Sequence, residues 1–547
     1  MTREENLTRQ SAEIRKFFRI TLPNKAVVSQ YLKDANKELE EYEAEINRLQ
    51  TAIYAVESKR DRLKRTAGLY RSLLSPIHAI PSEILNLIFA FFCEENELNR
   101  SPLPAALRLT MVCGRWRDIV ASTPSLWSSI FIDFNGLLPE DLYVLNLLTE
   151  RFLKQSQPAP LRLKLHLSEE DILAQALPSL NALVQNSHRW ETLDLSIARH
   201  VFPFTLFDRI CGRIPALRSL HLHEPGDGGT DDWNGYPPLN CFNSCPSLQY
   251  LNINPSLFPP TKLPFPWDQI KTLRLELAYS ESALPILSLC HGVEHLDVSE
   301  VGGGDIEPYS DHIISDSIKS ISITKATTQL DVDDIFKYTT LKHVLSLEIR
   351  GSHQPTGEWL RWDETMLHDF LLRSSCSITE LTLHSLPIID TQTLSLLHMM
   401  PSLRYLCLGE IPHPTNRRNR IITRRFLDGL AVNASLSSPS SIPFLPHLTK
   451  LKFILHAAGI SSRSLLQMLS SRWIPDPKHA AELGVECLRS ASIVVLTTAD
   501  TKPLERLQCF GHAGMNLTII YGSASDLYPM TDESGPSDSE AKDGENE

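Results

Sequence analysis

A possible metal site is the first chemistry that the residue types suggest, because His221-x-His223 is followed by Cys241-x-x-x-Cys245. Imidazole nitrogens and thiolates are ligands that zinc prefers. Residues two apart, such as the two histidines, share one face of a strand. However, Cys245 stands in the loop just before an expected strand, a position that cysteine also takes before two other strands. We therefore favour buried thiols, with zinc as the alternative, and we expect no cofactor.

The sequence lacks the common motifs of catalysis. It contains no Gly-x-x-x-x-Gly-Lys phosphate loop, no Gly-x-Ser-x-Gly nucleophile turn and no His-Glu-x-x-His zinc motif. The stretch Val301-Gly-Gly-Gly-Asp is rich in glycine but lacks the strand-to-helix spacing of a dinucleotide site. We expect a loop there. A catalytic role is not predicted, and an enzyme with an unrecognised site is kept as an alternative.

A basic run lies in an expected insertion and consists of Arg417, Arg418, Arg420, Arg424 and Arg425. We favour a solvated loop for this run. Contact with an acidic or phosphorylated partner and a nuclear import signal are the two alternatives.

Composition places the chain among ordinary globular proteins. Its 547 residues suffice for two to four domains, and 42% are hydrophobic and 22% charged. The sequence contains no stretch of 18 uncharged apolar residues, so no membrane span is predicted. Residues 1–10 lack the apolar core of a signal peptide. We therefore expect a cytoplasmic or nuclear protein with reduced cysteines.

Charge gives no indication of a nucleic-acid or membrane partner. The formal net charge is −12, and residues 531–547 hold seven acidic residues against one lysine, a net of −6. The rest of the chain is only mildly acidic, so broad attraction to nucleic acid or an anionic membrane is not expected. The composition from residue 521 to 547 predicts a disordered acidic tail.

Among the elements that the sequence predicts, the first is a long helix with a heptad pattern over residues 28–74. Apolar residues recur at alternating spacings of four and three, as at the a and d positions of a left-handed coiled coil. These positions are Val28, Leu32, Ala35, Leu39, Tyr42, Ile46, Leu49, Ile53, Val56, Arg60, Leu63, Ala67, Tyr70 and Leu74. We predict a coiled coil that joins two copies or pairs with another chain. A single helix folded onto its own chain is the alternative.

A second pattern, apolar-x-x-apolar-x-apolar, recurs ten times between residues 190 and 453. The steps between successive units run from 22 to 45 residues, mostly in or near the range of leucine-rich repeats. Several units begin with Pro-x-Leu, which fits a turn that leads into a strand. We predict an irregular leucine-rich-repeat solenoid with a curved parallel sheet, within an α/β fold.

The residues between these apolar positions are nearly all polar. A strand buried on both faces would be apolar there as well, so the sheet is expected to have one open, concave face. Open solenoid faces commonly bind partners. The residues expected to bind a target protein there are Asp194, His221, Asn252, Arg274, Glu276, Asp297, Glu348 and Arg350.

Residues 77–127 carry three short motifs in a fixed order. They are Ile-Pro-x-Glu-Ile at Ile80 to Ile84, Leu-x-x-Val-Cys-x-x-Trp-Arg at Leu109 to Arg117, and Pro-x-Leu-Trp at Pro124 to Trp127. The first two lie on amphipathic helical patterns whose apolar groups are too many for a module of this size to bury by itself. This stretch resembles an F-box, the helical module that docks onto the Skp-type adaptor of a cullin ubiquitin ligase. The order of coiled coil and F-box resembles that of many fungal F-box proteins. An ordinary helical subdomain is the alternative.

The resemblance implies a set of adaptor-binding residues on these helices. They are Ile80, Pro81, Ile84, Leu85, Ile88, Phe89, Leu109, Val112, Cys113, Trp116, Ile119, Leu126 and Trp127. It also implies a partner, the Skp-type adaptor, and cullin through that adaptor.

These patterns together predict five segments. They are a flexible N-terminus over 1–24, a coiled-coil helix over 25–75, an F-box over 76–130, a leucine-rich-repeat-like solenoid over 131–520 and the tail over 521–547. The function we favour is a non-catalytic substrate receptor of a Skp–cullin–F-box ubiquitin ligase. A leucine-rich-repeat scaffold that acts outside any ligase is the main alternative.

Overall fold

The structure is a computed structural model, and it describes the chain with several gaps. The described residues are 12, 15–16, 25–99, 103–223, 238–255, 263–276, 280–299, 312–326, 329–352, 362–411, 420–432, 443–457, 461–497 and 504–523. The expected loops at 226–235 and 301–305, Arg417 and Arg418 of the basic run, and the acidic tail from 524 onward lie outside these ranges. Residues 1–87 and 88–547 form two compact units, each considered by itself.

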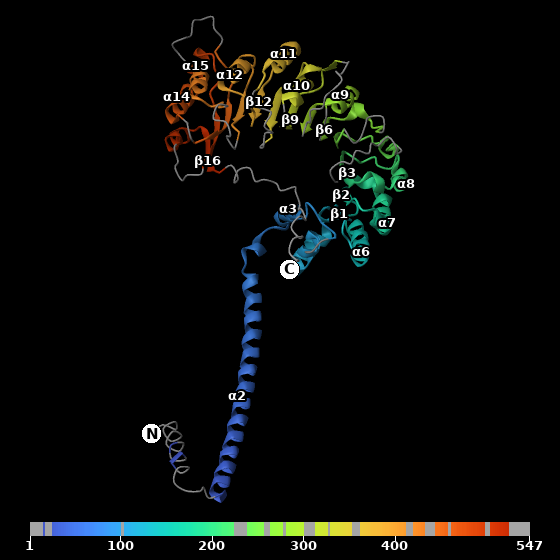
Figure 1. Ribbon diagram of the computed structural model, residues 1–547, viewed down its shortest axis with the longest axis vertical. Helices are drawn as coiled ribbons and strands as arrows, with labels where there is room; N and C mark the ends of the chain where they lie inside the picture. The colour runs from blue at the N-terminus through green and yellow to red at the C-terminus, as the bar shows by residue number, and fades with distance from the viewer. Residues whose placement is uncertain are drawn as a thin grey trace, which may run out of the picture. The chain divides into compact units, whose positions relative to one another are not determined.

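Helices and strands alternate through most of the second unit (Figure 1). The helices are α2 (Lys25–Leu73), α3 (Ser82–Phe92), α4 (Ala105–Thr110), α5 (Gly114–Ser122), α6 (Pro139–Gln155), α7 (Glu170–Gln185), α8 (Phe204–Phe207), α9 (Ser280–Leu289), α10 (Gln329–Lys337), α11 (Thr365–Ser374), α12 (Asp390–His398), α13 (Arg424–Leu430), α14 (Ser462–Arg472), α15 (Pro477–Glu482) and α16 (Gln508–His512). The strands are β1 (Ser129–Asp133), β2 (Leu161–Leu167), β3 (Trp190–Ile197), β4 (Ser219–His223), β5 (Tyr250–Ile253), β6 (Thr272–Glu276), β7 (His295–Ser299), β8 (Ile313–Ser315), β9 (Ser320–Ala326), β10 (Thr339–Leu341), β11 (Ser346–Gly351), β12 (Glu380–His384), β13 (Tyr405–Gly409), β14 (Lys450–His456), β15 (Ser490–Leu496) and β16 (Asn516–Gly522).

The first unit is dominated by the long helix α2. It runs for 49 residues, from Lys25 to Leu73, so the predicted long N-terminal helix is present. Its a and d positions include Leu39, Ile46 and Ile53, all exposed to solvent. Helices of this length derive most of their stability from packing an apolar face. That face of α2 is therefore exposed in the single chain.

Fourteen strands form one parallel sheet in nearly sequential order, from β1 to β16. The strands β8 and β10 pair separately in a small two-stranded parallel sheet. All ten strands expected from the apolar repeat are present in the large sheet, as β3–β7, β9 and β11–β14. Four further strands, β1, β2, β15 and β16, extend the sheet at its two ends.

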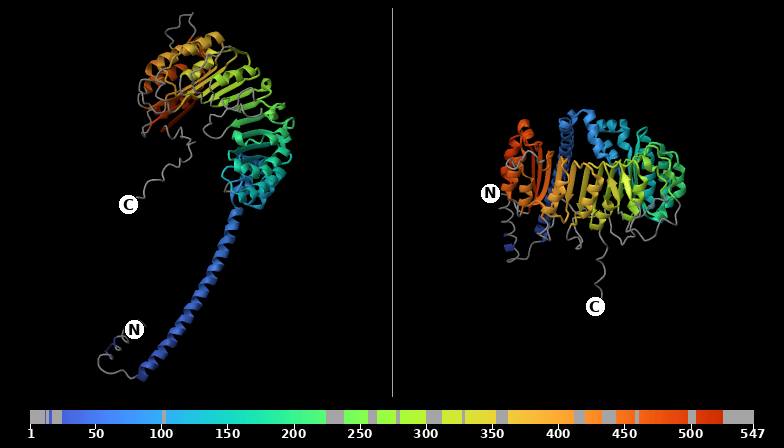
Figure 2. Two further views of the ribbon diagram at one scale, coloured as in Figure 1. Left: turned by 45° about the vertical axis from the view of Figure 1, so that its right-hand side comes forward. Right: turned by 90° about the horizontal axis from the view of Figure 1, so that it is seen from above.

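The register of the sheet aligns the apolar repeat positions of successive strands. Alternate residues point to one face, where helices α6, α7 and α9 to α12 lie (Figures 1 and 2), and they build a continuous core. One row of this core, buried throughout, runs through Ile130, Leu163, Leu193, Leu220, Leu251, Leu273, Leu296, Ile321, Leu347, Leu381, Leu406, Leu451 and Ala491. The polar residues between them point to the opposite face, which we call the open face.

The chain itself covers one edge of the sheet. Residues 96–98 lie beside β1, where the amide of Leu98 donates to the carbonyl of Phe131 and the amide of Phe131 donates to the carbonyl of Asn96, each at 3.0 Å. Edge strands expose unpaired backbone groups, and a covering segment removes that liability. The segment between α3 and α4 is thus anchored to the first strand of the sheet.

Candidate functional site

An apolar stripe on helix α3 is the first candidate site. Ile84, Leu87, Ile88 and Phe91 follow at i, i+3, i+4 and i+7, and all four are exposed. Phe91 is 80% exposed. Large apolar side chains that remain exposed in a contiguous stripe mark an interaction surface, because each would be stabilised by burial.

The turn between α4 and α5 adds two more exposed apolar residues, Met111 and Val112. Near it, the guanidinium of Arg108 lies 4.7 Å from the centre of the Phe92 ring. This cation–π contact holds the exposed ring in place. Apolar side chains of α3 and of the turn between α4 and α5 are therefore exposed to solvent.

Three buried aromatic residues and the partly exposed Trp116 support this surface from below. The rings of Phe89 and Trp116 lie 4.7 Å apart, and those of Trp127 and Phe152 lie 5.0 Å apart. The indole nitrogen of Trp127 donates to the carbonyl of Val120 at 2.8 Å. The motif tryptophans thus fix the last helix of the module and its exit into β1.

Asn96 ties the loop after α3 to the rest of the module. Its Nδ2 donates to the carbonyls of Cys93, Leu126 and Ser129 at 3.3, 3.0 and 3.1 Å, and its Oδ1 accepts from the amide of Ala106 at 2.9 Å. The side chain is fully buried. One side-chain amide therefore satisfies four backbone groups, which lie just after α3, on α4, just before β1 and on β1.

The thirteen residues predicted to bind the adaptor fall into three groups by their exposure. Pro81, Ile84, Ile88 and Val112 are exposed, while Ile80, Cys113 and Trp116 are partly exposed. The other six are buried in this structure: Leu85, Phe89, Leu109, Ile119, Leu126 and Trp127. Leu87, Phe91 and Met111 are exposed as well but were not among the thirteen. The helical period from Ile84 was the available signal for Leu87 and Phe91.

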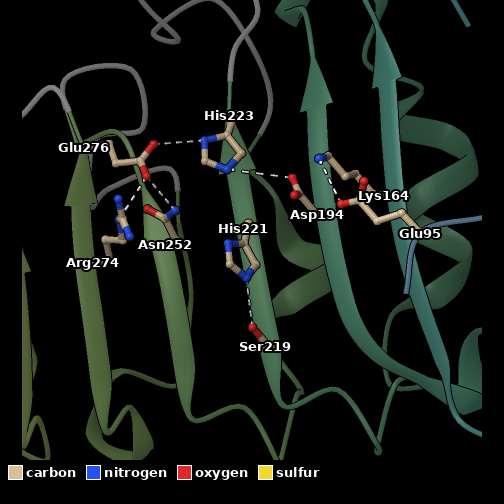
Figure 3. A network of polar contacts seen from close by, with 9 residues as sticks. All are labelled: Glu95, Lys164, Asp194, Ser219, His221, His223, Asn252, Arg274 and Glu276. Carbon is tan, nitrogen blue, oxygen red and sulfur yellow. Dashed lines mark hydrogen bonds and ion pairs between the residues drawn. The ribbon is translucent and has the colours of Figure 1, made fainter. Parts of the chain in front are cut away.

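The second candidate site is a network of charged residues on the open face (Figure 3). His223 on β4 lies between two carboxylates, with Nδ1 3.2 Å from Glu276 Oε2 and Nε2 3.7 Å from Asp194 Oδ1. The other oxygen of Glu276, Oε1, accepts a hydrogen bond from Nδ2 of Asn252 at 2.9 Å and lies 3.0 Å from Nε of Arg274. Four strands therefore contribute to one connected set of contacts.

The network continues to β7. A second pair of opposite charges lies further along the sheet, on β11. Arg274 Nη1 lies 3.7 Å from Asp297 Oδ2. On β11, Arg350 pairs with Glu348, which also accepts from the hydroxyl of Ser322 at 3.4 Å. Such charges on a face without helices can pair with a partner as well as with one another.

Burial and pairing shift the ionisation of this network. The hydrogen bond between His223 and Glu276 is the main reason that the pKa of Glu276 is lowered to about 2. The same hydrogen bond raises the pKa of His223 above 6.5. Burial lowers the pKa of His221, and burial raises the pKa of Asp297. His223 thus favours the charged form, and His221, beside Ser219 and Tyr250, favours the neutral form.

The eight predicted open-face residues all lie on the polar positions of β3 to β7 and β11. Five of them, Asp194, Asn252, Arg274, Glu276 and Asp297, belong to the connected network, whereas His221 contacts Ser219 and Glu348 contacts Arg350. The bridging residue His223 was not among the eight. Its position, two residues after His221 on the same strand face, was the available signal.

The zinc alternative finds no support in the arrangement of its residues. Cys241 and Cys245 are buried beside Cys211 and Asp208, whereas His223 contacts Asp194 and Glu276. Burial raises the pKa of the Cys245 thiol to about 12. Among the residues that the structure describes, no group of three His, Cys, Asp or Glu side chains could hold a metal ion.

The pairing of His223 predicts a pH dependence of stability. Because its folded pKa is raised, its contribution to stability is full below pH 6.5 and is lost as the pH rises through the folded value. Asp194, Glu276, Arg274 and His221 are the charged or titratable groups that act on His223.

The variant His223→Gln should therefore melt at a lower temperature than the wild type at pH 5.5, with a smaller difference at pH 8.5. Thermal unfolding followed by circular dichroism measures this, and His295→Gln, an exposed histidine on β7, is the matched control. An equal deficit at both pH values would contradict it.

Comparison with known proteins identifies one part of the chain. Residues 77–133 match the family model described as F-box-like, which covers 57 of the 547 residues. A search of curated proteins found no match. The F-box implies binding to a Skp-type adaptor and through it to cullin, and F-box proteins are typically non-catalytic substrate receptors. The exposed stripe of α3 lies inside the matched residues.

In the part of the chain that the structure describes, no single helix is long and apolar enough to cross a bilayer. One bent helix pair, residues 25–79 with Ser82–Phe92, meets the criterion of length and composition only when the two helices are joined across a 93° break.

Proposed function

We propose that this protein is a substrate-receptor subunit of a Skp–cullin–F-box ubiquitin ligase. The observation that carries the proposal is the apolar stripe of α3, which is exposed and lies within the F-box-like residues. The F-box would bind the adaptor, and other subunits would carry out the transfer of ubiquitin. The receptor itself contributes proximity and orientation of the target. This role would place the protein in the cytoplasm or the nucleus.

We further infer that the large sheet belongs to a leucine-rich-repeat-like solenoid whose open face binds the target, as in fungal F-box proteins of similar layout. Three observations support this: the repeat spacing, the sequential parallel strands and the polar residues on the open face. Solenoids of stacked repeats use such faces to hold partners. The charged network around Glu276 supplies groups that can discriminate between targets by charge complementarity.

Charge reversal on the open face tests the role of that face. The double variant Arg274→Glu with Arg350→Glu should lose target proteins that the wild type captures from cells treated with a proteasome inhibitor, by about tenfold or more, because it places carboxylates beside Glu276, Asp297 and Glu348. Adaptor capture should be unchanged. Arg463→Glu, an exposed arginine on α14, is the matched control. Equal loss of targets in both variants would reject the open face as the binding surface.

The alternative, a scaffold that acts outside any ligase, differs in what accompanies the adaptor. A ligase subunit should co-purify with cullin as well as with the adaptor, whereas a scaffold would retain the adaptor alone. Quantitative mass spectrometry of the purified complex distinguishes the two outcomes.

We also propose that α2 joins two copies of the protein through a coiled coil. The support is the unbroken heptad pattern and the exposure of its apolar residues in the single chain. Burial of each large apolar side chain stabilises association by roughly 1.5–3 kcal/mol before the costs of binding are subtracted.

A further inference from the structure

The direction in which two α2 helices would pair can be read from the residues along the heptads. In the pattern, Leu32, Leu39, Ile46, Ile53, Arg60, Ala67 and Leu74 take the a positions, and Val28, Ala35, Tyr42, Leu49, Val56, Leu63 and Tyr70 take the d positions. A parallel pair in register packs each a residue against its own copy, whereas an antiparallel pair packs a residues against d residues. The two arrangements therefore bring different side chains together.

Arg60 separates the two arrangements most clearly. It is the only charged residue at an a or d position, and in the single helix its guanidinium is exposed and paired with Glu57 and Asp61. A parallel pair would place two Arg60 side chains against each other in the core, a like-charge contact that is costly when buried. An antiparallel pair that overlaps the whole pattern is centred on Thr51 and places Arg60 against Tyr42 of the second copy. An aromatic ring attracts a guanidinium, so this layer is compatible with pairing.

The other layers of the antiparallel arrangement match apolar residues. Leu39 meets Leu63 of the second copy, Ile46 meets Val56, and Ile53 meets Leu49. The two small residues Ala35 and Ala67 meet each other, which gives one narrow layer, the third from each end of the pair. Apart from the layer of Arg60 with Tyr42, the layers between these two pair large apolar residues, whose burial stabilises the pair.

Charges beside the apolar positions favour the same direction. In a parallel pair, the flanking residues bring Glu38 beside Glu43 and Lys59 beside Lys64, with no pair of opposite charge. In the antiparallel pair, Glu45 lies beside Lys59, against one like-charge pair between Glu43 and Glu57. Like charges at these positions oppose association.

The helix as a whole also carries opposite charge at its two halves. Residues 25–49 contain four basic and six acidic residues, a net of −2, and residues 50–73 contain six basic and two acidic residues, a net of +4. Antiparallel pairing sets each half against the half of opposite sign along its full length. Parallel pairing sets like against like.

We propose that α2 pairs with α2 of a second copy of this chain in the antiparallel direction, centred on Thr51. This rests on the proposed self-association. Since each F-box-like segment follows the C-terminal end of its own α2, the two F-boxes would leave the coiled coil at opposite ends. A helix of 49 residues is about 70 Å long, so the two points at which the chains leave the coil would be about that far apart.

Cysteine cross-linking in the full-length protein tests the direction. Two variants, Leu39→Cys and Leu63→Cys, are prepared separately and then mixed under mild oxidation. We expect a disulfide between the peptides carrying positions 39 and 63 only in the mixture, at least tenfold above that of either variant alone. Disulfides of each variant with itself, absent from the mixed pair, would show a parallel coil and overturn the antiparallel proposal while self-association stands. The unmodified protein, whose Cys211 and Cys509 are exposed, controls for other cross-links.

Sedimentation equilibrium of the same full-length chain tests the self-association on which the proposal rests. We expect a mass that rises with concentration toward twice the 61.7 kDa of one chain. Ile46→Lys with Ile53→Lys should return it to one chain, and Tyr54→Lys, on the outer side of the helix, should not. A wild-type mass of one chain at high micromolar concentration would overturn both the self-association and its direction.

Discussion

Replacing Ile88 and Phe91 with serine is expected to reduce capture of the Skp-type adaptor by about tenfold or more, while the fold is preserved. Both side chains lie on the exposed stripe of α3, where Ile88 is 49% and Phe91 is 80% exposed. Truncating a central apolar residue of an interface commonly costs about 2 kcal/mol or more, and tenfold corresponds to about 1.4 kcal/mol. Surface positions contribute little to folding, so the loss should be confined to binding.

The measurement is pull-down of purified adaptor at several concentrations, with circular dichroism as the check of the fold. Leu372→Ser on α11 is the matched control, because Leu372 is equally large and exposed but lies outside the F-box-like residues. Unchanged capture by the α3 double variant would reject the stripe as the docking surface. Leu85→Ala would not answer the question, since Leu85 is only 1% exposed and its truncation would destabilise the helix as well.

The sequence predicted the architecture where its patterns have a regular period. The heptads of α2 and the ten apolar repeats gave the long helix and most of the parallel sheet, because burial on one face imposes those periods on the residues. The strands missing from the prediction explain its limits. In β15 the small residue Ala491 takes a core position, and in β16 the position three residues before Leu517 holds Gly514 where the pattern expects a large apolar residue.

The candidate sites were predicted less completely, for two physical reasons. Helix α3 is apolar on most of its circumference, so its sequence alone does not show that Leu85 and Phe89 point inward while Leu87 and Phe91 point outward. On the open face, the alternation predicted which residues share a surface. It could not show that His223 joins Asp194 to Glu276, because that contact depends on the spacing of three separate strands.

Asn96 is the sharpest example of a residue that the sequence could not reveal. It lies in the polar segment between α3 and α4, where the F-box resemblance carries no motif residue. Its partners Leu126 and Ser129 are 30 and 33 residues away in the chain. A polar residue in a polar segment predicts a solvated loop, yet this side chain is fully buried. Only the folded chain brings its partners to it.

Asn96→Ala is therefore expected to loosen the F-box module and to weaken adaptor binding without changing any exposed residue. The substitution leaves three carbonyls and the amide of Ala106 without their buried partner. Unpaired buried polar groups cost about 1–3 kcal/mol each, and partial relaxation should bring the total loss to roughly 3 kcal/mol. Hydrogen exchange should show faster exchange over residues 96–133, with the strands β11 to β14 unaffected.

The variant Asn96→Asp sharpens this test, because a carboxylate accepts hydrogen bonds but cannot donate them to the three carbonyls. We expect it to be at least as unstable as the alanine variant. Asn99→Ala is the graded control: Asn99 is only partly buried and exchanges two hydrogen bonds with the backbone of Asp133, so its loss should be smaller. If Asn96→Ala and Asn99→Ala exchange at the same rate, the buried amide does not hold the module together. Weakened adaptor binding in Asn96→Ala with an intact stripe would instead show that the loop behind α3 sets the orientation of the docking surface.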